Sequence, residues 1–143
     1  MTSSTSLTPP RPEQRPPGDR AGRVLAALCA AATLVPLVGG LVVTLPDTPG
    51  DYLMTEGWRT FGYIMFVGLW TLVAVAPRGC PGAWELLLIH KSAVTLFALA
   101  QLDLPDAPQT AVIDGIIVLA TGIAYVVCRG WRSWQVLPEL SRR

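Results

Sequence analysis

Residues 24–45 read VLAALCAAATLVPLVGGLVVTL, a stretch of 22 residues without a charged side chain. An α-helix rises ~1.5 Å per residue, so this stretch is long enough to cross a hydrocarbon layer ~30 Å thick. Three more apolar stretches follow, separated by segments that contain Pro or Gly, at residues 60–76, 83–102 and 109–128. The sequence therefore predicts an all-α integral membrane protein, a four-helix bundle whose short loops make successive helices antiparallel.

The composition of the whole chain supports this fold class. Its 143 residues are 51% hydrophobic and 15% charged, with a mean hydropathy of +0.44. Soluble domains average roughly 25% charged residues, so most soluble classes are excluded. The net charge of +1 gives no reason to expect a nucleic-acid partner, and the lipid bilayer is the expected surrounding.

The chain divides into three expected regions. Residues 1–22 contain five prolines and few large apolar side chains, which predicts a disordered cytoplasmic tail. Residues 23–131 hold the four spans, and residues 132–143 form a short basic tail. The segment 38–40, Val-Gly-Gly, is similar to a signal-peptidase site, but the apolar run continues to Leu45, so we expect the first span to be retained.

Basic residues outside the predicted spans are distributed unevenly. Those on the side that carries both termini are Arg11, Arg15, Arg20, Arg23, Arg78, Arg129, Arg132, Arg142 and Arg143. Arg59 alone lies on the other side, so the positive-inside rule predicts that both termini are cytoplasmic. The preference for Arg over Lys, together with abundant Ala, Gly and Pro, is typical of high-GC bacterial genomes, which makes the bacterial cytoplasmic membrane the expected location.

Ionisable side chains inside the predicted spans are the strongest functional signal, because a charge at a helix centre costs ~2.5–3.5 kcal/mol and must be offset. One interpretation is a hydrated pocket open to the cytoplasm, in which Lys91 attracts an anion or a headgroup and His90 titrates. Its wall would consist of Glu85, His90, Lys91 and Ser92. In the other interpretation His90 is neutral and bonded to another helix, while Lys91 extends past Trp84 to the inner interface. Both interpretations stay open at this stage.

Depth in the membrane argues against an ion pair between Lys91 and Asp114, the ionisable residue of the fourth span. Lys91 is expected ~12 Å from the inner edge and Asp114 ~7 Å from the outer edge, so their depths differ by ~10 Å in a ~30 Å layer. Side chains also tilt toward their own helix N-terminus, which moves these two apart. We therefore expect Asp114 to pair with Arg59 at the outer end of the second span.

The three cysteines do not suggest a metal or redox centre. Cys29, Cys80 and Cys128 are far apart in the sequence, and the predicted topology puts all of them near the cytoplasmic side, where thiols stay reduced. Their spacing is unlike that of metal ligands, and a single His cannot supply the two imidazoles of a bis-His haem. We expect no metal and no cofactor. Quinone-linked disulfide-forming enzymes need paired cysteines on the outer side, and small multidrug transporters need an acidic residue in the first span. The sequence has neither feature, so both classes are excluded.

Four predicted spans with cytoplasmic termini, and Gly68-Leu69-Trp70 near the middle of the second span, resemble the DoxX-like group of small bacterial membrane proteins. That group carries a His-Gly and Lys signature in its first span, whereas the adjacent His and Lys of this chain lie in the third. No functional residue is therefore transferred from the family. The resemblance implies an accessory subunit, often linked to membrane redox processes.

The expected function is accordingly non-enzymatic: an accessory or interaction subunit of the membrane, bound to another membrane protein or to a second copy of itself. The alternative is a homo-oligomeric transporter for a small solute, or one coupled to protons, that uses Glu85, His90 and Lys91. A bundle of ~120 residues has little room for a private channel, so transport would require an oligomer.

Overall fold

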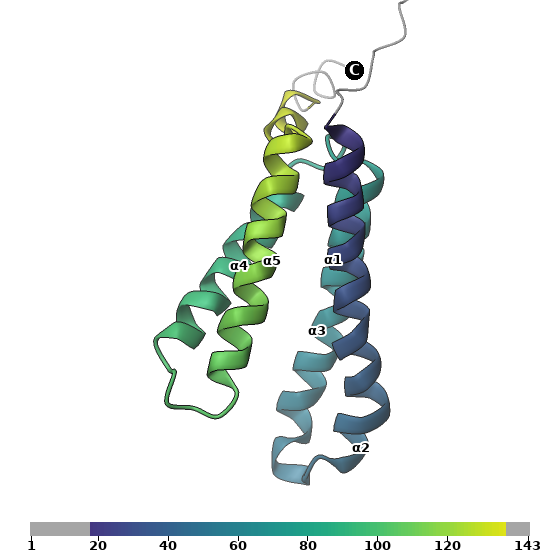
Figure 1. Ribbon diagram of the computed structural model, residues 1–143. Helices are drawn as coiled ribbons and strands as arrows, with labels where there is room; N and C mark the ends of the chain where they lie inside the picture. Colours follow the sequence, from purple (N-terminus) through teal and green to yellow (C-terminus); the bar gives the residue numbers. More distant parts are fainter. Residues whose placement is uncertain (1–17, 137–143) are drawn as a thin grey trace, which may run out of the picture.

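The computed structural model describes residues 18–136, and every regular element in that range is helical (Figure 1). In chain order the elements are α1 (Asp19–Gly39), the π-helical turn η1 (Gly40–Thr44), α2 (Leu45–Asp47), α3 (Gly50–Val75), α4 (Ala83–Leu99), α5 (Ala107–Val127) and the 3-10 segment η2 (Gly130–Val136). The predicted tails lie largely outside the described residues, although residues 19–22 belong to α1 and residues 132–136 to η2.

Three of these helices are long and apolar enough to cross a membrane. They are the continuous helix Asp19–Asp47, α3 and α5. Large apolar side chains such as Val42, Met65 and Leu119 are exposed on these helices, as expected of the surface that a membrane protein presents to lipid. The helix α4 has 17 residues, at the lower end of the length that can span a bilayer.

The ends of the helices differ from the ends of the apolar stretches. The second helix begins at Gly50 instead of residue 60, because the helix continues beyond its uncharged part. In that extension Glu56 forms an i,i+3 salt bridge with Arg59, a pairing that supports helical structure. The third helix ends at Leu99 instead of residue 102, and the fourth begins at Ala107 instead of residue 109.

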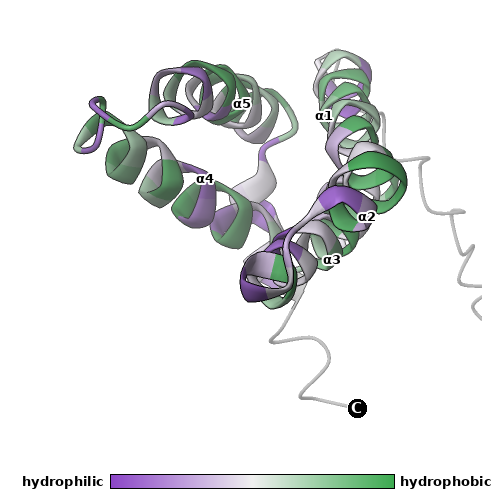
Figure 2. Ribbon diagram, turned by 90° about the horizontal axis from the view of Figure 1, so that it is seen from below, coloured by the Kyte–Doolittle hydropathy of each residue, from purple (hydrophilic) through white to green (hydrophobic). Residues whose placement is uncertain are grey.

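The helices form two hairpins, α1 with α3 and α4 with α5, and these two pairs have the largest interfaces in the described chain. The helix α1 also packs against α5, whereas α3 and α4 have little contact. Figure 1 shows the hairpins meeting at the end where the described chain starts and finishes, and separating toward the opposite end. Figure 2 shows the same two pairs from below, with α1, α2 and α3 on one side and α4 and α5 on the other.

The apolar core lies at the end where the hairpins meet. Its largest fully buried side chains are Trp70, Trp84 and Leu87, which pack with Ala26 and Ala124. Small residues let the backbones approach closely here. A Cβ atom on Gly22 would lie 2.5 Å from Cys128 Sγ and 3.1 Å from the Ala124 carbonyl, so α1 and α5 cannot pack this closely with a larger residue at that position.

Candidate functional site

The central feature of the interior is an ion pair between α4 and α5. Lys91 Nζ donates a hydrogen bond to Asp114 Oδ1 over 2.8 Å. Both residues are buried, with 7% of Lys91 and 8% of Asp114 exposed. Charges in such surroundings are stable only when they are paired, so this contact links the two helices of the second hairpin.

This pair overturns the expectation that Lys91 and Asp114 lie at different depths. Counted from the loop that joins α4 to α5, Lys91 is eight residues before Leu99 and Asp114 is seven residues after Ala107. At ~1.5 Å per residue the two side chains are ~12 and ~10 Å from the loop, and therefore at nearly the same level. The expected depth difference came from helix ends that were each misplaced by two or three residues.

The structure also differs from the other contacts expected of Asp114 and Lys91. Arg59 pairs with Glu56 on its own helix, so the predicted pair of Arg59 with Asp114 is wrong. Lys91 does not extend past Trp84 to the interface: Trp84 is fully buried, and its Nε1 atom donates to the Pro77 carbonyl over 2.7 Å.

An aromatic ring from the first hairpin covers the ammonium group of Lys91. Lys91 Nζ lies 5.1 Å from the centroid of the Phe66 ring in α3, within the range of a cation–π contact. The ring of His90 packs against the same Phe66, with 4.4 Å between the centroids. Phe66 thus connects α3 to α4 across an interface that is otherwise slight.

A cavity of about 720 Å³ lies between the two hairpins, with the ion pair in its wall. Each long helix contributes to the lining. The lining residues are Ala32, Thr33, Val35 and Pro36 of α1, Arg59 and Tyr63 of α3, Lys91 of α4, and Asp106, Gln109, Thr110, Ile113, Asp114 and Ile117 at or near the start of α5. The cavity lies toward the α4–α5 loop, the end opposite to the termini. A second hollow, of about 540 Å³, is lined by five residues of α1 alone and brings no separate elements together.

The four residues of the predicted cytoplasmic pocket do not form one site. Lys91 lines the cavity described above, which lies toward the opposite end from the one expected. Glu85 Oε1 instead accepts hydrogen bonds from Tyr125 Oη and Trp134 Nε1, each over 3.0 Å. His90 is exposed and packs on Phe66, and Ser92 is half-buried outside the cavity lining. The expected grouping of Glu85, His90, Lys91 and Ser92 is therefore corrected to the pair of Lys91 with Asp114.

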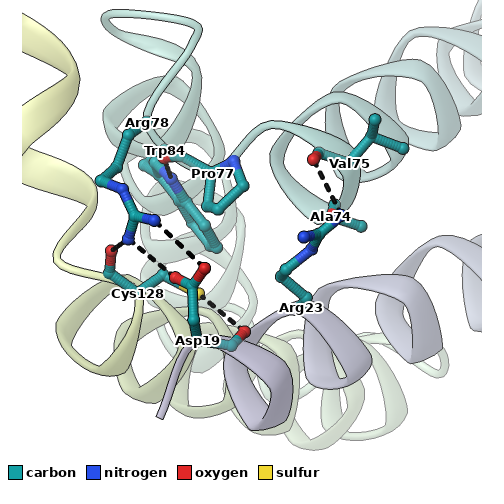
Figure 3. Close-up of polar contacts among 8 residues, drawn as sticks. All are labelled: Asp19, Arg23, Ala74, Val75, Pro77, Arg78, Trp84 and Cys128. Atoms are coloured by element: carbon teal, nitrogen blue, oxygen red, sulfur yellow. Dashed lines mark hydrogen bonds and ion pairs between the residues drawn. The ribbon is translucent and has the colours of Figure 1, made fainter. Parts of the chain in front are cut away.

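A polar network at the end of the molecule that carries the termini was missed in the sequence (Figure 3). The Arg78 guanidinium, in the loop between α3 and α4, contacts both carboxylate oxygens of Asp19 over 2.7 and 3.1 Å. It also donates to the Cys128 carbonyl over 2.9 Å. Asp19, an acidic residue just before the first predicted span, was the available signal, because a carboxylate so close to a span needs a cationic partner if the helix extends to include it.

Arg23 extends this network to the C-terminal end of α3. Its Nε and Nη2 atoms donate to the carbonyls of Ala74 and Val75 over 2.7 and 2.9 Å, where α3 ends and those carbonyls lack helical donors. Figure 3 shows Arg23 and Asp19 projecting from α1 toward different partners. The two residues together fix α1 to α3, to the following loop and to the end of α5.

Within residues 18–136, no group of three or more His, Cys, Asp or Glu side chains could hold a metal ion. The chain was also compared with known proteins, and no family model, no curated protein and no solved structure matches it.

Proposed function

We propose that this chain is an up-and-down four-helix protein of the bacterial cytoplasmic membrane, with α4 as a fourth span and both termini in the cytoplasm. The three longer helices support membrane insertion, and α4 lies between two of them in the chain, so it must return across the same layer. Arg23 and Arg78 lie at the end with the termini, whereas Arg59 lies near the opposite end, an asymmetry that supports the orientation.

We further propose a non-enzymatic role, as an accessory or interaction subunit. One observation carries this proposal: the two carboxylates and the ammonium group of α4 and α5 are used to hold helices together. Lys91 and Asp114 neutralise each other, and Glu85 is bound by Tyr125 and Trp134. Side chains committed to such contacts stabilise a scaffold, and the resemblance to the DoxX-like group points to the same kind of role.

Site-specific photocrosslinking in intact cells tests this role. A photoreactive amino acid is placed at Met65 on α3 or at Leu119 on α5, two exposed positions on different hairpins. An interaction subunit should give a crosslink to one distinct membrane protein from one of these faces, and that protein should co-purify in mild detergent. Crosslinks to lipid and to the chain itself alone would contradict the proposal.

A transporter is the second candidate, and the cavity between the hairpins favours it. In that case the site would be the pair of Lys91 with Asp114 rather than Glu85, His90 and Lys91 together. Vesicles that contain the purified protein and a trapped pH-sensitive dye test this candidate. Proton flux that disappears in Lys91→Met, while the variant remains folded, would favour transport over the accessory role.

A further inference from the structure

The charges around the cavity are balanced and arranged in two layers. Lys91 and Asp114 form the inner layer, next to each other. Arg59 and Asp106 belong to the outer layer, near the α4–α5 loop. The lining thus has two cationic and two anionic side chains, and Arg59 is also paired with Glu56, which lies outside the lining. A ligand with a net charge of either sign would be attracted by one half of the lining and repelled by the other.

The inner layer has unused hydrogen-bonding capacity. An ammonium group has three donors, and Lys91 uses one of them on Asp114 Oδ1, while the centroid of the Phe66 ring lies 5.1 Å from the same nitrogen. Asp114 Oδ2 has no hydrogen-bond partner in the described part of the chain, and it is not among the atoms fully closed off from solvent. The Ala32 carbonyl is a further acceptor, because in a regular helix it would bond the N–H of residue 36, which is a proline here and has no N–H. Both residues line the cavity.

The remaining lining separates into polar and apolar parts. Gln109 and Thr110 lie beside the charged outer layer, whereas Val35, Ile113 and Ile117 form apolar wall. A few directed polar groups in a largely apolar enclosure are typical of small-molecule sites. A cavity of about 720 Å³ has room for a charged headgroup together with an aliphatic portion.

We propose that this cavity binds a net-neutral zwitterion, a molecule that carries a primary ammonium, an anionic carboxylate or phosphate and an aliphatic portion. Its anionic end binds the free donors of Lys91 and Arg59, and its ammonium binds Asp106 and the free oxygen of Asp114. The aliphatic portion lies against the apolar wall. An ethanolamine phospholipid and a free aliphatic amino acid both have this chemistry. The site lies between the two hairpins and is lined by residues of this chain alone, so it does not depend on the protein partner proposed above.

The test measures binding to the full-length purified protein in neutral maltoside detergent after removal of lipid. Dioleoylphosphatidylethanolamine and leucine are the zwitterionic probes. Dioleoylphosphatidylglycerol is the lipid probe with a net negative charge, 4-methylpentanoate is leucine without its ammonium, and isoamylamine is leucine without its carboxylate. The expected result is a rise in the thermal unfolding midpoint with a zwitterion and none with the singly charged probes. A response to the lipid alone identifies a headgroup, and a response to leucine alone identifies a free amino acid.

A matched pair of variants locates the site. Asp106→Asn removes one charge of the outer layer and should weaken zwitterion binding, measured by titration calorimetry, by about three- to fivefold. Asp103→Asn removes the same charge from the same loop at a position outside the cavity lining, and it should bind as the unchanged protein does. The proposal is overturned if neither zwitterion binds, if singly charged probes bind equally well, or if the two variants have the same affinity.

Discussion

Lys91 on α4 and Asp114 on α5 form a buried ion pair at 2.8 Å, although 23 residues separate them in the chain. The pair fixes the register of the second hairpin, because a shift of either helix by one turn, ~5.4 Å, would separate the charges. It also places a charged layer in the wall of the cavity between the hairpins. The same two side chains thus contribute to the stability of the fold and to the properties of the candidate site.

The first prediction concerns the energy of this pair. Lys91→Met and Asp114→Asn should each lower the free energy of unfolding by about 2–3 kcal/mol, because each leaves the other side chain buried without its partner. The double variant should lose less than the sum, with a coupling energy of at least about 1 kcal/mol. Unfolding by SDS titration in mixed micelles measures all three. Additive losses would show that the two residues do not interact.

The second prediction uses Arg59 as the comparison for the double-variant measurement on Lys91 and Asp114. Arg59 bonds to Glu56 and not to Asp114, so the losses in Arg59→Gln and Asp114→Asn should add to within about 0.5 kcal/mol in the double variant. The same SDS titration applies. A coupling energy as large as that between Lys91 and Asp114 would place Arg59 on Asp114 and contradict the observed geometry.

The third prediction concerns the polar network at the end that carries the termini. Asp19 is 3% exposed and accepts two hydrogen bonds from Arg78, so Asp19→Asn should lower the free energy of unfolding by about 1–3 kcal/mol through the loss of charge-assisted bonds. Asp47→Asn is the control, since Asp47 is exposed at the other end of the same long helix. Thermal unfolding in detergent should separate the two variants. Equal midpoints would contradict a structural role for Asp19.

The fourth prediction concerns the close approach of α3 and η1, the turn that continues α1. A Cβ on Gly40 would lie 2.6 Å from Thr60 Oγ1 and 2.7 Å from Thr60 Cγ2, whereas a Cβ on Gly39 would meet nothing within 4 Å. Gly40→Ala should therefore destabilise the protein by about 1–3 kcal/mol through overpacking. Gly39→Ala should be neutral to within about 0.5 kcal/mol. Chemical unfolding of the two variants side by side measures the difference, and equal stabilities would show that the two helices are not so close there.

The fifth prediction tests the orientation in the membrane. Thr48 lies just after α2, at the end opposite to the termini, and Cys80 lies in the loop between α3 and α4. With cytoplasmic termini, a membrane-impermeant thiol reagent should label Thr48→Cys in intact cells and should reach Cys80 only after the cells are opened. Thr48→Cys is labelled in a Cys80→Ser background so that the signals stay separate. Labelling in the reverse order would require the opposite orientation.

The sequence alone determined the fold class and the approximate positions of the helices. Long uncharged runs predict spanning helices because a polar backbone in lipid must satisfy its own hydrogen bonds, and the run at residues 24–45 falls inside the continuous helix Asp19–Asp47. The ends of the helices were less accurate. Hydropathy marks the part of a helix that lies among lipid chains, and α3 continues beyond that part through a salt bridge on its polar end.

Only the tertiary structure decided which charged residues meet. A shift of two or three residues at a helix end moves a side chain by ~3–5 Å along the axis, enough to separate or to join Lys91 and Asp114. Partners such as Asp19 and Arg78, 59 residues apart, depend on how two hairpins pack, which local patterns do not encode. The cavity between the hairpins has the same origin. The sequence thus determined that the buried charges need partners, because isolated charges in a membrane are costly, and the packing of the helices determined which partners they have.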